Sequence, residues 1–157
     1  MADDLTVRAA RPGDARVLAE LRWAFKHEDH DGSPAAGARP VEQAERWLRD
    51  RLGGGRWPAW VVEHDGEVCG HVFLHLVERV PEPYADNDPL GYVTNFYVTP
   101  PHRNRGAGAA LLAAVRRYAE AEGLDTLIVW PSERSAPLYR RSGFRPPEEL
   151  LELPVAP

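Results

Sequence analysis

The fold is decided by residues 91–112, GYVTNFYVTPPHRNRGAGAALL, which change in character along their length. Leu90–Val98 is aromatic and β-branched, which predicts a strand that the two following prolines end. Gly106–Glu122 carries alanine and leucine at helical spacing, which predicts a helix. The chain therefore runs from a strand, through a turn that carries Arg103 and Arg105, into a helix.

The start of this helix is expected to bind an anion. The first N–H groups of a helix have no partner inside it, and the helix dipole is positive at that end. Gly106 and Gly108 keep side chains away from these amides, while Arg103 and Arg105 supply positive charge. The sequence therefore predicts a phosphate or diphosphate ligand.

Two common phosphate motifs are absent from this turn. No Gly-Lys-Ser/Thr ending is present, so the turn lacks the lysine and hydroxyl of a P-loop. The dinucleotide pattern Gly-x-Gly-x-x-Gly is broken by Ala107 and Ala109–Leu111. Nucleoside triphosphatases and dinucleotide-binding domains are thus disfavoured, and an α/β domain for another phosphorylated ligand stays open.

Two motifs in order resemble the GNAT superfamily of N-acetyltransferases. Arg103-x-x-Gly106-x-Gly108, behind a strand, is similar to the family's acyl-CoA-binding motif. Downstream, Tyr139-Arg-Arg-Ser-Gly-Phe144 is similar to the family's closing helix and its Tyr-x-x-x-Gly-Phe ending. The order of predicted elements matches the family over nearly the whole chain.

The resemblance implies one GNAT-like domain over residues 1–157 with an α/β (mixed α+β) fold. The expected sheet is central, mixed and mostly antiparallel, with a parallel strand pair splayed at the cofactor site and helices on both faces. Few residues follow Phe144, which puts the family's usual final hairpin in doubt. The predicted strands are Leu5–Arg8, Trp57–Glu63, Glu67–Glu78, Leu90–Val98, Asp125–Trp130 and Leu151–Leu153. Four helices are predicted. The first begins after a cap at Asp14, and the others are Val41–Leu52, Gly106–Glu122 and Arg134–Ser142.

The resemblance also implies acetyl-CoA as acyl donor, with its diphosphate on the turn and its thioester along the end of the strand. Backbone amides at that strand would stabilise an oxyanion. No metal is expected, because His27–Asp31 lacks the His-Glu-x-x-His pattern and is typical of a solvated charge run. The expected cofactor-binding residues are Phe96, Tyr97, Val98, Arg103, Asn104, Arg105, Gly106, Ala107, Gly108, Ala109 and Ser132.

Tyr139 and Asn95 are the expected catalytic residues. Tyr139 would protonate the departing thiolate of CoA, a transfer from a phenol to a thiolate that is uphill by about 2 kcal/mol from ordinary pKa values. Alternatively, Tyr139 packs against the sheet and hydrogen-bonds the sulfur without giving up its proton. Asn95 would orient the amide, the acetyl group or a water, or is simply a polar strand residue.

The sequence assigns no general base. The strand before the turn carries no carboxylate, and His71 and His75 are interpreted as core or edge histidines. The acids of residues 28–31, with Glu82, Asp86 and Asp88, are expected to line an acceptor entrance and attract a cationic amine.

Composition limits the class of protein further. The 157 residues fit one domain, and the net charge of −5 opposes nucleic-acid binding. No apolar run approaches the ~20 residues that span a bilayer, and the start lacks a signal core. A single cysteine, Cys69, cannot form a disulfide within the chain, so a reducing cytoplasm is the expected compartment. Cys69 is also a poor candidate for a covalent acetyl carrier.

We therefore expect an acetyl-CoA-dependent N-acetyltransferase that moves the acetyl group directly, in a ternary complex, to a small-molecule or peptide amine. The alternatives are a transferase that uses a larger acyl-CoA and a catalytically silent CoA-binding sensor or interaction module. A homodimer is expected from the family alone.

Overall fold

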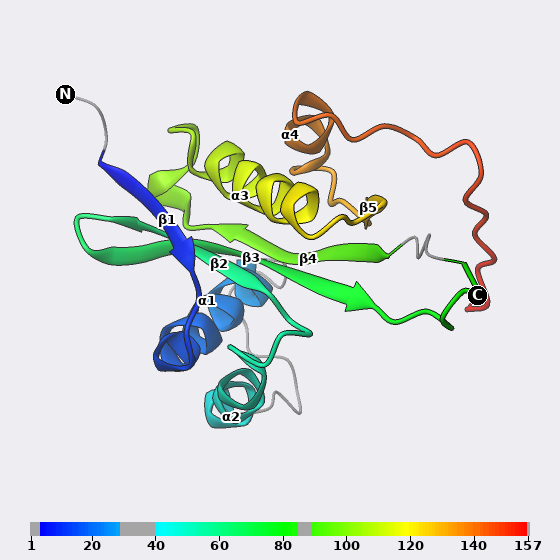
Figure 1. Cartoon of the computed structure of the whole chain (residues 1–157). Helices are drawn as coiled ribbons and strands as arrows, with labels where there is room; N and C mark the ends of the chain where they lie inside the picture. Colours follow the sequence, from blue (N-terminus) through cyan, green and yellow to red (C-terminus); the bar gives the residue numbers. More distant parts are fainter. Residues whose placement is uncertain (1–3, 29–39, 85–88, 157) are drawn as a thin grey trace.

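A five-stranded sheet forms the centre of the molecule, with helices on both faces. The computed structural model describes residues 4–28, 40–84 and 89–156 (Figure 1). The strands are β1 Leu5–Ala9, β2 Ala59–His64, β3 Glu67–Val77, β4 Leu90–Val98 and β5 Thr126–Val129. The helices are α1 Ala15–Glu28, α2 Val41–Arg51, α3 Ala107–Ala121 and α4 Ala136–Arg141, with short 3₁₀ turns at Pro12–Asp14 and Pro100–His102.

The order of strands in the sheet follows the order in the sequence. Strands β1 to β4 pair antiparallel with their neighbours, and β5 pairs parallel with β4. The β2–β3 hairpin turns at Asp65 and Gly66, both with positive φ, as a tight Asp-Gly turn requires. The predicted fold class, a mostly antiparallel sheet with one parallel pair, is confirmed.

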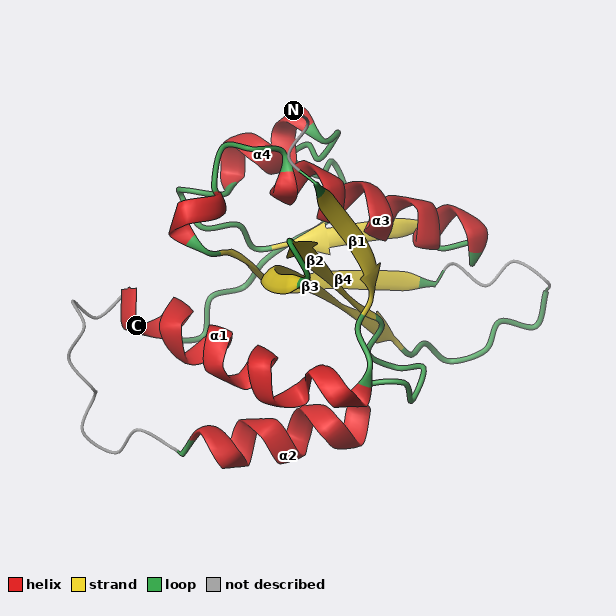
Figure 2. Cartoon of the chain, turned by 90° about the vertical axis from the view of Figure 1, so that its left-hand side faces the viewer, coloured by secondary structure: helices red, strands yellow, loops and turns green. Residues whose placement is uncertain are grey.

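Two cores hold the helices to the sheet, and the alternation of side chains along β3 builds both. Val72 and Leu74 join the core beneath α3, whereas Phe73 faces the core with Leu18 of α1 and Leu48 of α2. Figure 2 shows α1 and α2 on one face and α3 and α4 on the other. In the three described ranges, no helix is long and apolar enough to cross a membrane.

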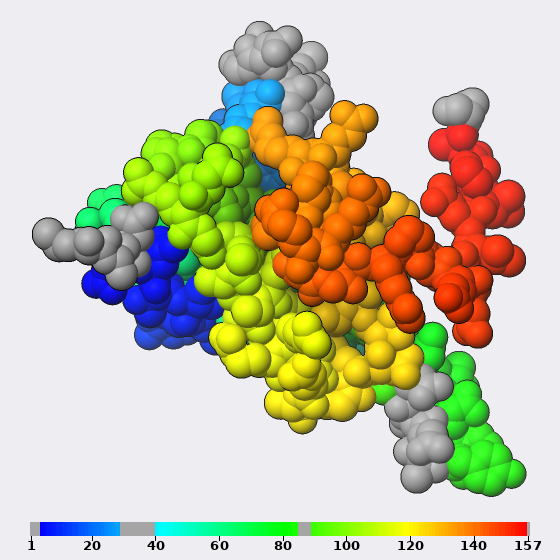
Figure 3. Space-filling model, turned by 90° about the horizontal axis from the view of Figure 1, so that it is seen from above, coloured from blue at the N-terminus to red at the C-terminus, as the bar shows by residue number. Residues whose placement is uncertain are grey.

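Two sequence predictions are wrong in detail. Asp14 does not cap α1: its carboxylate accepts hydrogen bonds from the Arg8 guanidinium and the Arg11 amide, which ties the 3₁₀ turn to β1. Residues 151–153 form no strand, and none of the strands in the described ranges pairs with them. Figure 3 shows this segment standing off the body, with Leu151 and Leu153 exposed.

Candidate active site

The predicted strand, turn and helix are present and leave free amides at the start of α3. Gly106 precedes the helix with φ of +87° and makes no side-chain cap. The first helical bond of the turn joins the Ala110 amide to the Gly106 carbonyl at 3.0 Å. Within the described residues, the amides of Ala107, Gly108 and Ala109 have no hydrogen-bond acceptor, so they could bind an anion.

The two glycines of this turn have different roles. A Cβ on Gly106 would meet no atom within 4 Å, so its left-handed φ is what requires glycine. A Cβ on Gly108 would lie 2.7 Å from the Leu138 side chain and 3.0 Å from the Phe96 ring. Gly108 therefore lets α3 approach α4 and β4 closely, a packing role that the sequence did not indicate.

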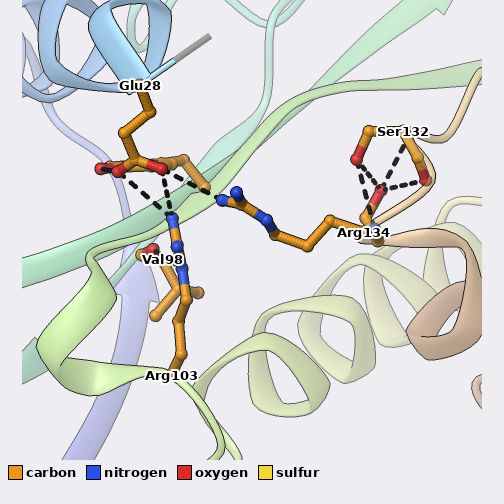
Figure 4. A network of polar contacts seen from close by, with 7 residues as sticks. Glu28, Val98, Arg103, Ser132 and Arg134 are labelled. Atoms are coloured by element: carbon orange, nitrogen blue, oxygen red, sulfur yellow. Dashed lines mark hydrogen bonds and ion pairs between the residues drawn. The ribbon is translucent and has the colours of Figure 1, made fainter. Parts of the chain in front are cut away.

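Arg103, expected to bind the anion, contacts protein acceptors in the structure. Its Nε donates to the Val98 carbonyl at 2.9 Å, and one terminal nitrogen lies 3.0 Å from the Glu28 carboxylate. Arg134, before α4, reaches the same carboxylate at 3.0 Å (Figure 4). The Tyr97 hydroxyl also donates a hydrogen bond to it. Glu28 thus joins the end of α1 to the turn after β4 and to the segment before α4.

The charges of this network reinforce one another. Burial opposes ionisation of Glu28, but hydrogen bonds from Tyr97, Arg103 and Arg134 outweigh it and lower the pKa of this carboxyl. Burial, with the hydrogen bond to Glu28, raises the pKa of Tyr97 to about 12. A carboxylate held ionised by two arginines is a weak proton acceptor, so Glu28 organises the network rather than serving as the general base.

Strand β4 carries a bulge at the predicted thioester position. Phe73 of β3 pairs with Thr94 and His71 pairs with Tyr97, so one residue of β3 opposes the two residues Asn95 and Phe96. Asn95 has φ of +53°, a left-handed backbone that asparagine tolerates. Pairing with β5 ends before this point, at Val93, so the parallel pair is splayed there, as predicted.

Asn95 is held from two sides. Its main-chain carbonyl lies 2.6 Å from Nδ1 of His71, and its side-chain oxygen accepts a hydrogen bond of 2.7 Å from Arg22 of α1. The Asn95 side chain therefore joins β4 to α1 through this hydrogen bond.

Tyr139 lies beneath this bulge in an aromatic cluster. The side chain is only 3% exposed, and its ring centroid lies 5.6 Å from that of Phe96 and 5.2 Å from that of Phe144. Burial raises the pKa of Tyr139, with a smaller contribution from nearby Tyr92. The hydroxyl has no hydrogen-bond partner among the described residues, which leaves it able to donate to a ligand.

The remaining predicted site residues have mixed roles. The Tyr97 ring stacks on Phe25 of α1 at 5.0 Å, so only its main chain faces the splayed strands. Ser132 and Ser135 exchange hydrogen bonds in the turn before α4, which occupies the Ser132 hydroxyl. Asn104, at φ of +63°, and Arg105 are exposed in the turn.

A groove of about 1210 Å³ runs along β5 and includes Tyr139 but none of the turn residues 103–109. Phe96 links the two regions, because its ring lies near both Gly108 and Tyr139. Phe96 therefore lies close both to the start of α3, which carries the free amides, and to Tyr139.

Sequence reasoning missed the partners that hold the site in place. Glu28 was interpreted as part of a solvated charge run, but it binds two arginines and a tyrosine. Arg22 and Arg134 belong to no sequence motif, so neither was predicted as a site residue. His75 stacks on Trp57, as an edge histidine would. The acids at 29, 31, 86 and 88 lie outside the described residues, and no cluster in the described ranges could hold a metal ion.

Comparison with known proteins agrees with the geometry. The sequence model of the Acetyltransferase (GNAT) family matches residues 17–144. The chain is 32% identical over 149 residues to a mycothiol acetyltransferase from Streptomyces avermitilis, covering 90% of this chain and 43% of that protein. It is 29% identical over 122 residues to an aminoglycoside N(6')-acetyltransferase type 1 from Stenotrophomonas maltophilia, covering 78% and 72% of the two chains. The chain thus spans less than half the length of that mycothiol acetyltransferase.

Solved structures show the same fold. A GCN5-related N-acetyltransferase from Ralstonia eutropha superposes with a TM-score of 0.72 at 28% identity, covering 97% of this chain and 99% of the other. A predicted acetyltransferase from Clostridium acetobutylicum, solved with acetyl-CoA, gives 0.76 at 20% identity over 96% of each chain, which supports the fold alone. With its strand, turn and helix, its bulged β4 and its buried tyrosine, the chain belongs to the GNAT acetyltransferase family.

Proposed function

We propose that the protein is an acetyl-CoA-dependent N-acetyltransferase that uses direct transfer in a ternary complex. The observation that carries this proposal is the open start of α3, where three amides without acceptors follow a left-handed glycine. These amides and the helix dipole suit the diphosphate of acetyl-CoA, which would supply the activated acetyl group.

The bulge and the tyrosine supply the chemistry on the protein's side. Asn95 and Phe96 interrupt the pairing of β4 with β3, which would leave a main-chain N–H for the oxygen of the thioester. Burial raises the pKa of Tyr139, so the side chain keeps its proton and its hydroxyl can hydrogen-bond the sulfur of CoA. The same shift makes full proton transfer to the thiolate less favourable than from an ordinary phenol, so an acid role requires that the site stabilise the transition state. Cys69 is buried with a raised pKa, which opposes a covalent acetyl-cysteine and favours direct transfer.

The acceptor would be a small-molecule amine. Relatives named as mycothiol, aminoglycoside and amino-acid acetyltransferases support this class. In a homodimer, a second copy of the chain would cover the outer edge of β5. A molar mass of twice 17.5 kDa, measured by light scattering, would support this dimer.

Thiol release tests the proposed activity. The protein is mixed with acetyl-CoA and a panel of amines, and free CoA is measured with a thiol reagent. Turnover that depends on the amine supports the transferase. Binding of CoA without turnover for any amine would instead favour the silent sensor, and faster release from longer acyl-CoA would favour a larger acyl group.

A further inference from the structure

His71 is a fully buried histidine on β3 with one ring nitrogen in use and the other without a partner. Its exposure is 0%, and Nδ1 lies 2.6 Å from the main-chain carbonyl of Asn95. Nε2 is the buried side-chain atom that has no hydrogen-bond partner in the described part of the chain. The ring packs edge-on against Phe73 and lies 5.9 Å from the ring of Tyr97.

The contact with Asn95 fixes the proton on the ring. A carbonyl oxygen only accepts hydrogen bonds, so Nδ1 must carry the hydrogen and donate it. Burial lowers the pKa of His71 to about 4, and nearby Arg22 also opposes its charged form. The neutral ring therefore donates one N–H to the bulge and leaves the Nε2 lone pair buried without a partner in the described part of the chain.

The unpaired Nε2 lone pair lowers the stability of the folded protein, so stability alone does not explain a histidine at position 71. An unsatisfied buried acceptor is unfavourable, whereas an aliphatic side chain would fill the same apolar space without that penalty. The compensating feature is the hydrogen bond to a left-handed residue in an interrupted ladder. A donor beneath that carbonyl stabilises the one backbone conformation that turns β4 aside at Asn95.

We propose that His71 is a positioning residue for acyl transfer, which acts by holding the bulge at Asn95. This inference rests on the proposed function. His71 fixes the main chain from β3 while Arg22 fixes the Asn95 side chain from α1, so the N–H groups beyond Asn95 have one orientation. Pre-set donors of this kind matter for the transition state more than for binding of the cofactor.

A pair of substitutions separates this role from simple packing. In His71→Asn, the amide nitrogen lies close to the position of Nδ1 and can still donate to Asn95, but a cavity and a buried amide oxygen destabilise the fold. In His71→Leu, the donor is lost while apolar packing is kept. Activity should follow the order wild type, Asn, Leu, whereas thermal stability of the Leu variant should exceed that of the Asn variant.

The expected result is a fall in kcat of about 100-fold for His71→Leu, with a KM for acetyl-CoA close to the wild-type value. His75→Leu is the matched control, because His75 lies four residues further along β3 and contacts Trp57 rather than the bulge. Its kcat should match that of the wild type. A kcat for His71→Leu within twofold of wild type, or losses that follow melting temperature across the variants, would overturn the proposal.

Nitrogen NMR of the wild-type histidine gives a readout that does not depend on turnover. The proposal requires the Nδ1–H tautomer of His71 at neutral pH, and the opposite tautomer would overturn it. If no amine is acetylated by the wild type, the proposed function fails, and this spectrum still decides whether His71 donates to the bulge.

Discussion

Phe96 and Tyr97 are neighbours on β4 whose side chains serve opposite faces of the sheet. The Phe96 ring lies near Gly108 and Tyr139, whereas the Tyr97 ring stacks on Phe25 and its hydroxyl binds Glu28. A strand alternates its side chains, so a single residue step separates the α3 face of the sheet from the α1 face. The bulge at Asn95 and Phe96 therefore sets which side chain faces α3 and Tyr139.

Removal of the Tyr139 hydroxyl tests its proposed acid role. Tyr139→Phe keeps the ring in its aromatic cluster, so the fold and CoA affinity should hold. We expect kcat to fall about 100-fold, because proton donation to the leaving sulfur is lost. Tyr118→Phe is the control, since Tyr118 packs on Trp60 at 5.3 Å, away from the bulge. Equal kcat for Tyr139→Phe and wild type would remove the acid role and leave Tyr139 as packing.

The depressed pKa of His71 predicts a pH dependence of stability. Its pKa is about 4 in the folded protein and near 6.5 otherwise, so the unfolded chain binds more protons between these values. His71 alone should therefore lower the unfolding free energy of the wild type by about 3 kcal/mol as pH falls from 6.5 to 4. Urea unfolding of His71→Leu should show a smaller loss over the same window. Parallel curves for the two proteins would contradict the buried neutral histidine.

At the scale of elements, close packing of α3 depends on Gly108. Gly108→Ala would place a methyl group against the ends of the Leu138 and Phe96 side chains, and the shift of these side chains should cost about 1 kcal/mol, the low end for overpacking. Gly13→Ala is the control, because a Cβ at Gly13 meets no atom within 4 Å. Chemical unfolding should show a loss for the first variant only. Equal stability of both would mean that α3 shifts freely.

Elements with strong local patterns were predictable, and elements that depend on distant partners were not. Between Leu90 and Ala121, β-branched residues predicted the strand, prolines predicted the turn, and the spacing of alanines predicted the helix. Leu151–Leu153 carried apolar residues suited to a strand, yet a strand needs a neighbour, which the sequence could not supply. Glu28 was missed for a similar reason, because its partner Arg134 lies 106 residues along the chain.

At the scale of the whole molecule, binding of CoA at α3 should stabilise the entire fold. A ligand at 100 times its Kd adds about 2.7 kcal/mol, which raises Tm by roughly 8 °C in a domain of this size. Pantetheine is the control, because it keeps the thiol arm but lacks the diphosphate. Differential scanning fluorimetry should show the shift with CoA alone. An equal shift with pantetheine would mean that the amides of α3 contribute little.

In the proposed complex, the start of α3 binds the diphosphate of CoA while Tyr139 faces the sulfur. A crystal structure of the protein with CoA would show both contacts. We expect diphosphate oxygens within hydrogen-bond distance of the amides of Ala107, Gly108 and Ala109, with the sulfur beside the Tyr139 hydroxyl. Cofactor bound elsewhere, for example in the β5 groove with the α3 amides facing solvent, would contradict it.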